Sequence, residues 1–234
     1  MVVCLFISVS GCYKIESGIQ LTQVEELQGR AEQEKDSIEK KEEIILPDPK
    51  MKGEISLEEA FSSRRSDRHF QQKDLELEHI SQILWAAQGI TESSRGFRTA
   101  PSAGALYTLE LFVVKSDGLF HYIPADHKLE KLSPSDFRSD LMKASLFQES
   151  ISEAPAVIVI AAVFERTTVK YGERGVRYVY MEAGHACQNI LLEATALGLG
   201  AVPIGAFSDN EVQKALSLQL NCIPLYVIPV GYKK

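Results

Sequence analysis

Residues 156–164 (AVIVIAAVF) constrain the fold most strongly, because this run contains no polar side chain. The side chains of a β-strand point alternately to its two faces, so a strand of this composition must be covered on both. Such a strand lies in the middle of a sheet that has helices on each side. We therefore expect a sheet sandwiched between two helical layers.

Two apolar runs upstream predict a β-hairpin. Residues 109–114 and 119–123 flank Asp117-Gly118, a dipeptide that supplies the positive φ angles of a tight turn. Apolar spacing and capping residues predict the other elements: a short helix opened by the capping box Ser56–Glu59, helices at 77–88 and 176–197, a helix capped by Asp209, and strands at 201–204 and 225–230. The expected fold class is α+β, an α/β/α sandwich built on a mixed sheet.

The N-terminus raises a targeting question. Residues 1–12 (MVVCLFISVSGC) are apolar but shorter than the roughly 20 residues that span a bilayer. They resemble the end of a bacterial lipoprotein signal with a lipobox at Val9-Ser10-Gly11-Cys12, although no Lys or Arg precedes them. We predict a signal remnant at 1–12 and a membrane tether through lipidated Cys12 on the extracytoplasmic face. If Cys12 carries no lipid, the cytoplasm is the expected compartment.

The following residues, 13–50, are predicted to be an acidic tether, and 51–234 the folded domain. The stretch 20–43 is rich in Glu, Gln and Lys, and Gly29 interrupts its one weak helical pattern at Leu21, Val24 and Leu27. Pro47 and Pro49 then keep the chain extended. The domain is expected to start near Met51.

Charge and cysteine spacing exclude several classes of function. The formal net charge of −7 disfavours binding to nucleic acid or to an anionic membrane surface. The four cysteines, at positions 4, 12, 187 and 222, form no C-x-x-C pair, so a zinc ribbon or a thioredoxin-type centre has no support. Cys187 and Cys222 lie in apolar contexts and are expected in the core.

One segment is basic within this acidic chain. Arg64-Arg65-Ser66-Asp67-Arg68 follows a predicted helix, and its three guanidinium groups and one hydroxyl can together bind a dianionic phosphate. The alternative is a set of exposed arginines that pair with Glu58 and Glu59. Spacing alone does not separate the two interpretations.

Three more segments have features of a ligand site. Residues 100–107 (APSAGALY) have the small side chains of a loop that approaches a flat ligand, although an ordinary tight connection has them too. Lys170 and Tyr171 precede a glycine-rich helix entrance, where both can transfer protons. Residues 198–207 (GLGAVPIGAF) have a backbone fixed by glycine and proline. No phosphate-loop or dinucleotide glycine pattern is present.

Taken in order, these segments resemble the nitroreductase-like flavoprotein superfamily. The chain contains R-R-S-x-R-x-F, then A-P-S-A-G-A-L-Y, then K-Y-G-x-R-G-x-R-Y-x-x-x-E-A-G-H-x-x-Q-N, then G-L-G-A-V-P-I-G-A-F. The resemblance covers about residues 55–232. Within the superfamily it is similar to the SagB-type dehydrogenases, whose best-known members oxidise azolines in ribosomal peptides. It implies a mostly antiparallel sheet and an intertwined homodimer that binds FMN at its interface.

The resemblance also implies roles for individual residues. Four match the stretch that holds the FMN phosphate, ribityl chain and pyrimidine edge: Arg64, Arg65, Ser66 and Arg68. Three match the loop that the partner subunit lays against the flavin: Ser102, Ala103 and Gly104. Three match the segment that covers one ring face and aims a backbone N–H at flavin N5: Pro203, Ile204 and Gly205. Lys170 and Tyr171 match a Lys-Tyr pair implicated in removing the substrate proton.

The chain departs from the superfamily pattern in three places. Ala105 stands where a P-S-x-x-N loop has an asparagine on the flavin, and Gly205-Ala206 stands where many nitroreductases have Glu-Gly. A longer basic tail is missing after Lys234, so Lys233 and Lys234 are the candidates to replace it.

The leading hypothesis is an FMN-dependent oxidoreductase that transfers hydride between flavin and a small-molecule or peptide substrate, with azoline dehydrogenation as its sharper form. The alternatives are a nitro or quinone reductase supplied by NAD(P)H, and a non-catalytic FMN-binding surface lipoprotein. Glu182, His185 and Asn189 share a helix face, but no metal site is expected, because the face has too few further ligands. His185 and Gln188 are expected at the dimer interface instead.

Overall fold

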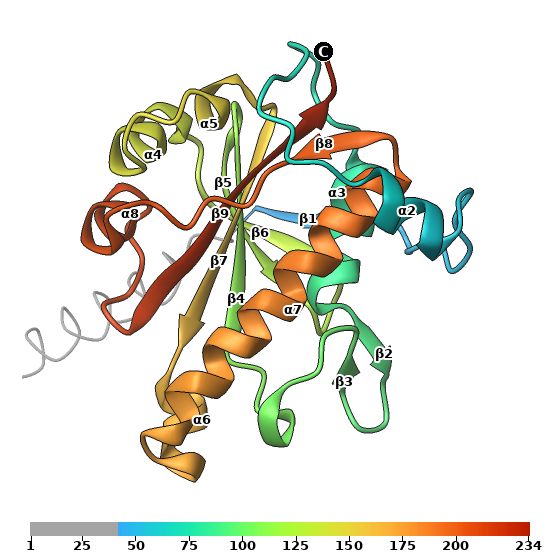
Figure 1. The fold of residues 1–234 in the computed structure, drawn as a ribbon. Helices are drawn as coiled ribbons and strands as arrows, with labels where there is room; N and C mark the ends of the chain where they lie inside the picture. Colours follow the sequence, from blue (N-terminus) through green and yellow to red (C-terminus); the bar gives the residue numbers. More distant parts are fainter. Residues whose placement is uncertain (1–41) are drawn as a thin grey trace, which may run out of the picture. The chain divides into compact units, whose positions relative to one another are not determined.

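The computed structural model describes residues 42–234, which form an α/β/α sandwich (Figure 1). The expected fold class is confirmed. The predicted lipobox at Cys12, the weak helix around Val24 and most of the acidic tether lie outside the described residues. Within the described part, no helix is both long and apolar enough to cross a membrane.

The central sheet has seven strands in the order β1-β6-β5-β4-β7-β9-β8, and every ladder in it is antiparallel. The strands are β1 (Glu43–Ile45), β4 (Leu109–Lys115), β5 (Gly118–Ile123), β6 (Lys128–Ser133), β7 (Ala156–Val163), β8 (Leu199–Ala201) and β9 (Cys222–Tyr232). A separate small hairpin pairs β2 (Ile90–Glu92) with β3 (Phe97–Arg98). A parallel component enters only as the single bridge Ser66–Ala201, among the residues described.

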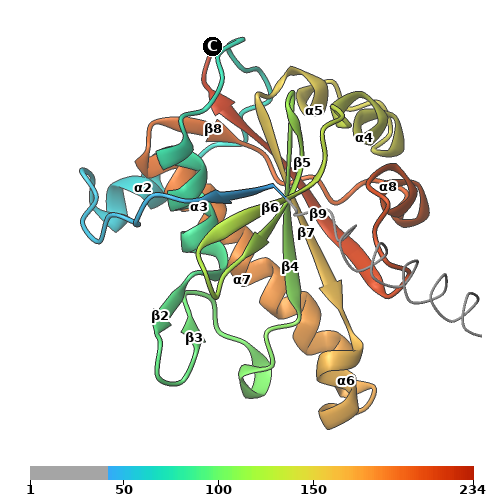
Figure 2. The ribbon, with the colours of Figure 1, turned by 180° about the vertical axis from the view of Figure 1, so that it is seen from behind.

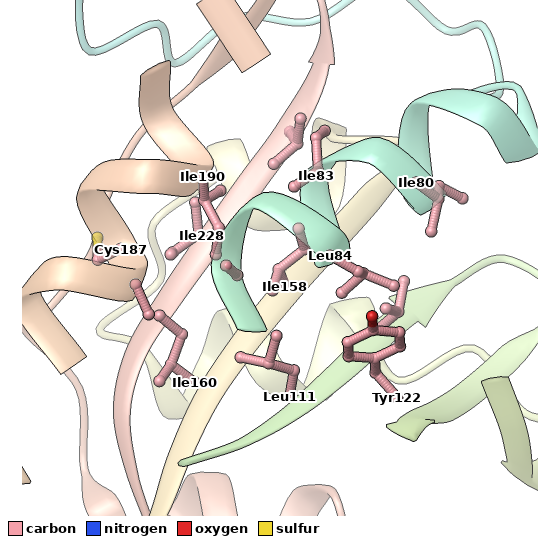
Figure 3. Close-up of a cluster of buried hydrophobic side chains, with 14 of the residues drawn as sticks. Ile80, Ile83, Leu84, Leu111, Tyr122, Ile158, Ile160, Cys187, Ile190 and Ile228 are labelled. Atoms are coloured by element: carbon pink, nitrogen blue, oxygen red, sulfur yellow. The ribbon is translucent and has the colours of Figure 1, made fainter. Parts of the chain in front are cut away.

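The apolar strand β7 lies in the middle of the sheet, and its two faces belong to different cores. Ile158 and Ile160 pack in the cluster under α3 and α7, while Val157 and Val159 pack in a second cluster on the opposite face. Figure 3 shows the first of these clusters. The prediction that both faces of this run are covered is confirmed.

The helices are α2 (Leu57–Ser63), α3 (Leu77–Gln88), α4 (Arg138–Ala144), α5 (Ser150–Glu153), α6 (Glu165–Tyr171), α7 (Arg174–Ala196) and α8 (Asp209–Ala215). Figures 1 and 2 show α7 crossing one face of the sheet. The capping box is present, because Ser56 and Glu59 each bind the other's backbone N–H. The cap of α8 is Ser208 rather than Asp209, since the Ser208 side chain accepts from the Glu211 N–H.

The compact unit begins before Met51, where the sequence pattern placed its start. β1 pairs with β6 as an edge strand, and Leu46 is buried in the core. Lys128 Nζ lies 2.9 Å from a Glu43 carboxylate oxygen across this pair. Residues 43–46 therefore belong to the sheet rather than to the tether.

Candidate functional site

The arginine segment follows α2 and runs beside the edge strand β8. Ser66 forms a parallel bridge with Ala201, and the Asp67 N–H donates to the Ala201 carbonyl at 3.1 Å. Gly200 allows this close approach, since a Cβ there would lie 2.8 Å from Asp67 Cβ. The bridge therefore fixes the backbone positions from which the arginine side chains on either side of Ser66 extend.

Within the described part of the chain, the guanidinium groups of this segment have no carboxylate partner. Arg65 donates to the carbonyl oxygens of Ser62 and Arg64, and Arg68 to that of Ser66. Within residues 42–234, no ion pair joins Arg64, Arg65 or Arg68 to an acidic side chain. The Glu59 carboxylate accepts from the Ser56 N–H instead. Arg65 and Arg68 are exposed, but among the described residues neither they nor Arg64 form the expected pairs with Glu58 and Glu59.

The C-terminal residues lie next to the same segment. Lys233 bridges Phe70 in an antiparallel pair, and its Nζ lies 3.8 Å from Asp67 Oδ2. Lys234 Nζ lies 3.6 Å from Glu153 Oε2. Of the two lysines, Lys233 is thus the one beside the arginines.

Residues 203–205 continue from β8 along the edge of β9. Both backbone polar groups of Ile204 bind Val227, at 2.9 and 3.0 Å. Pro203 has no N–H, so the remaining amide is that of Gly205, which is exposed and has no acceptor among the described residues. No atom lies within 4 Å of a Cβ built on Gly205. The space beside Gly205 is therefore open enough for a flat ligand.

Residues 102–107 form a strained loop around the short 3₁₀ helix η1 (Ala103–Ala105). Gly104, Ala105 and Tyr107 have φ values of 64°, 54° and 47°. Non-glycine residues rarely adopt this left-handed conformation, which costs about 1–3 kcal/mol each and persists only where the surroundings impose it. Contacts outside the loop must therefore hold it.

The loop lies directly against the predicted Lys-Tyr pair. A Cβ on Gly104 would lie 2.8 Å from Tyr171 Oη and 2.9 Å from Lys170 Nζ. Lys170 is exposed and Tyr171 half-buried, with the Tyr171 ring edge-on to Tyr178 at 5.2 Å. Both residues end α6, where Gly172 with φ 56° breaks the helix before α7. The structure thus brings Gly104, Lys170 and Tyr171 together.

A buried carboxylate of α7 binds this loop from behind. Glu182 is 2% exposed, and its Oε2 accepts from Ser102 Oγ at 2.6 Å and from Thr108 Oγ1 at 3.3 Å. Ser102 Oγ in turn accepts from the Tyr107 N–H at 2.9 Å. Burial raises the pKa of Glu182 above its ordinary value, although these hydrogen bonds and the charge of Arg98 oppose the shift.

A second polar cluster fastens α6 to β4. Arg166 donates to the Tyr107 carbonyl at 3.2 Å and to the Glu110 carboxylate, which also binds His121 Nε2 at 2.7 Å. Burial raises the pKa of Glu110, but the hydrogen bond from His121 and the charge of Arg166 outweigh it and hold that pKa below its ordinary value. The helix that carries Lys170 is therefore tied to the strand that follows the loop.

The predicted site residues fall into two separate groups. The arginine group adjoins Ala201, just past the C-terminal end of α7, and the Lys-Tyr group lies just before its N-terminal end. With 23 residues, α7 is about 34 Å long. Figure 1 shows β8 and α6 at opposite ends of this helix. Within one protomer, the two groups therefore cannot contact the same small ligand.

Two other features lie apart from these groups. A cavity of about 780 Å³ opens between residues 50–57, α3 and the C-terminal half of α7, and none of the predicted site residues lines it. Glu182, His185 and Asn189 do not converge, because His185 is exposed and Asn189 Nδ2 donates to Ala86 O. No group of three potential ligands that could hold a metal occurs among residues 42–234.

Sequence reasoning considered Glu182 only as a metal ligand and did not connect it with the loop. The signal that could have found it is an acidic residue between Val179 and Ala183 on the apolar side of a helix. A buried charge in such a position needs hydrogen-bond partners from another element.

Comparison with known proteins adds a family assignment to this geometry. The model described as "Nitroreductase family" matches residues 61–232. "Putative nitroreductase MJ1384" of Methanocaldococcus jannaschii is 46% identical over 82% of this chain and 96% of its own length. The Microcin B17-processing protein McbC of Escherichia coli is 28% identical over 82% of this chain and 76% of its own. The crystal structure of a putative nitroreductase from Ralstonia eutropha JMP134 superposes with a TM-score of 0.76 at 30% identity, covering 82% and 90% of the two chains.

Proposed function

Because this chain belongs to the nitroreductase family, which marks it as an oxidoreductase, we propose that it uses FMN to remove hydride from an organic substrate. The observation that carries the proposal is the set of three guanidinium groups, beside the Ser66–Ala201 bridge, that form no ion pair with an acidic side chain of residues 42–234. Positive charge of this density in a chain of net charge −7 suits an anionic ligand.

The residues present fit FMN. Arg64, Arg65 and Arg68 would hold its phosphate and neighbouring polar atoms, because no acidic side chain of residues 42–234 binds their donors. The free Gly205 amide and the open space beside it would accommodate the edge of a flat ring. When bound, FMN supplies a two-electron acceptor for hydride.

Lys170 and Tyr171 are proposed to handle the proton of the reaction. Oxidation of a C–H/C–H or C–H/N–H pair to a double bond releases one hydrogen as hydride and the other as a proton. Lys170 Nζ and Tyr171 Oη both rest against Gly104, and Lys170 is open to solvent, so a proton taken there can leave to water. Arg166 and Glu110 keep α6 in place during this transfer.

The division of the site between the two ends of α7 leads us to propose a homodimer. A second copy turned end over end would place its Lys-Tyr group beside the arginine group of the first. The exposed His185 and Gln188 of α7 are then interface residues, as the family resemblance implies.

The first test is FMN binding. Protein purified without added cofactor should be yellow or should quench the fluorescence of added FMN on titration. Replacing Arg64 and Arg68 together by alanine should weaken binding at least tenfold, since hydrogen bonds to charged groups contribute about 1.5–3 kcal/mol each. Arg95→Ala is the matched control, because Arg95 is exposed and pairs with Glu92. Wild-type protein that is colourless and does not bind added FMN contradicts the proposal.

The sharper form of the proposal is dehydrogenation of a peptide azoline, which the similarity to a Microcin B17-processing protein favours. A thiazoline-containing peptide is the probe, and oxidation is followed as a mass loss of two hydrogens. Lys170→Ala should abolish most turnover while FMN stays bound. The similarity to a putative nitroreductase favours the second candidate, reduction of nitro or quinone compounds by NAD(P)H. Quinone-dependent NADPH oxidation that survives Lys170→Ala, with no peptide oxidation, selects that candidate.

A further inference from the structure

We propose that Glu182 is a positioning residue, which holds the strained loop 102–107 in register with Lys170 and Tyr171 through the hydroxyl of Ser102. The inference rests on the proposed function, because that function assigns the substrate proton to the Lys-Tyr pair, and the family resemblance implies that this loop lies against the flavin. Glu182 itself is buried and touches neither.

The hydrogen bonds around Glu182 form one continuous chain. Its carboxylate accepts from Ser102 Oγ at 2.6 Å, and Ser102 Oγ accepts from the Tyr107 N–H at 2.9 Å. Ser102 and Tyr107 are the two ends of the loop that contains the left-handed residues, so these hydrogen bonds close the loop across its base. Without the carboxylate, the Ser102 hydroxyl loses its acceptor and its fixed orientation.

Glu182 is an unfavourable residue for its position unless it has such a role. It is 2% exposed, and its second oxygen, Oε1, has no hydrogen-bond partner among residues 42–234. An apolar side chain there would avoid the cost of burying a polar atom without a hydrogen bond. The half-buried Arg98 of β3 is the charged group that faces it, and Arg98 also stacks on the Tyr107 ring at 4.5 Å. Glu182 and Arg98 thus both contact the same loop.

The loop's position determines where the Lys-Tyr pair can sit. Gly104 lies in contact with both Lys170 Nζ and Tyr171 Oη. If the loop relaxes toward ordinary backbone angles, this contact surface moves away from both groups. Glu182 of α7 thereby determines how the loop contacts Lys170 and Tyr171 at the end of α6.

The test compares Glu182→Ala and Ser102→Ala with the conservative variant Glu182→Gln. Two quantities are measured: hydrogen exchange of the Tyr107 amide, and the Kd for FMN from fluorescence quenching. We expect both alanine variants to raise each quantity about fivefold, which corresponds to about 1 kcal/mol, one net hydrogen bond. Glu182→Gln retains an acceptor oxygen and should stay within about twofold of wild type. Glu193→Gln is the control, since burial also raises the pKa of that half-buried α7 carboxyl.

Two results overturn the proposal. One is an alanine variant that only melts at a lower temperature, with Tyr107 exchange and FMN affinity unchanged. The other is a loss in Glu182→Gln as large as in Glu182→Ala. If Glu182→Ala does not fold, Ser102→Ala at the half-buried loop position decides. Wild-type protein that binds no FMN defeats the proposed function alone, because Tyr107 exchange still reports on Glu182.

Discussion

Replacing Gly104 by alanine separates the cost of its backbone angle from the cost of its contacts. Gly104 and Gly96 have nearly equal left-handed φ values, 64° and 66°, but nothing lies within 4 Å of a Cβ on Gly96. Alanine in this conformation costs about 1–2 kcal/mol. Both Gly104→Ala and Gly96→Ala should therefore lower the free energy of unfolding by a similar amount, and the melting temperature by about 2–4 °C per kcal/mol.

Only Gly104→Ala should also impair the site. The new methyl group would lie 2.8 Å from Tyr171 Oη and 2.9 Å from Lys170 Nζ, whereas ordinary contact begins at 3.4 Å. Both flexible side-chain ends must then retreat by about half an ångström, and displacements approaching 1 Å cost up to about a hundredfold in rate. We expect roughly a tenfold loss of thiazoline-peptide oxidation.

Urea unfolding followed by the fluorescence of the single tryptophan, Trp85, measures stability in the same preparations. Equal losses of turnover in the two variants would show that backbone strain, and not the contact with Lys170 and Tyr171, limits activity. An unchanged rate in Gly104→Ala would refute the placement of this loop beside the reacting groups.

Three further outcomes are expected. In Gly200→Ala the new Cβ would lie 2.8 Å from Asp67 Cβ and should displace Asp67 from β8. FMN binding, measured by fluorescence titration, should weaken severalfold. Unchanged affinity would mean that the Ser66–Ala201 bridge does not position the arginines. Burial raises the pKa of Glu182 above 4.5, although the charge of Arg98 opposes the shift. The contribution of Glu182 to the free energy of unfolding is therefore complete below pH 4.5, where the side chain is protonated, and is lost as the pH rises through the raised pKa. The stability of wild type relative to Glu182→Gln should accordingly fall with rising pH above about 4.5 in urea titrations, and a flat difference would contradict a titrating carboxyl. Burial raises the pKa of Cys187 to about 12 and that of Cys222 to about 11, so peptide mapping after iodoacetamide treatment at pH 8 should find both unmodified in folded protein, and rapid labelling of either would show that its core opens.

Elements with a strong local signal could be predicted from the sequence. Residues 77–88 have helical spacing and a glycine immediately after them, and α3 has those bounds. The Asp117-Gly118 turn joins two strands whose register places Val114 opposite Leu119. In these segments local preference and tertiary packing favour the same structure.

Other elements depend on partners far away in the chain. β6 (KLEKLS) carries charges that disfavour a strand, but it pairs with β5 and with β1, Leu129 is buried, and Lys128 and Lys131 pair with Glu43 and Glu42. α6 contains Thr167, Thr168 and Val169, which are weak helix formers, and Arg166 fastens it to Glu110. No local pattern encodes these contacts.

The candidate site shows the same division. The order of motifs singled out residues that lie near the two ends of α7, and the structure places Gly104 in contact with Lys170 and Tyr171, but their roles stay a prediction. The role of Glu182 could not be predicted, because its partner Ser102 is 80 positions away. Whether these residues act together on FMN stays a prediction.

The length of α7 predicts the result of a subunit-mixing experiment. If each site takes its arginines from one chain and its Lys-Tyr pair from the other, a variant of the arginine group and a variant of the Lys-Tyr pair can restore activity when they form a mixed dimer. In a freely exchanging equal mixture of the Arg64→Ala/Arg68→Ala double variant and Lys170→Ala, assayed at an FMN concentration too low to load the double variant, half of the dimers are hybrids with one intact site. The mixture of two inactive variants should then recover roughly a quarter of the wild-type turnover.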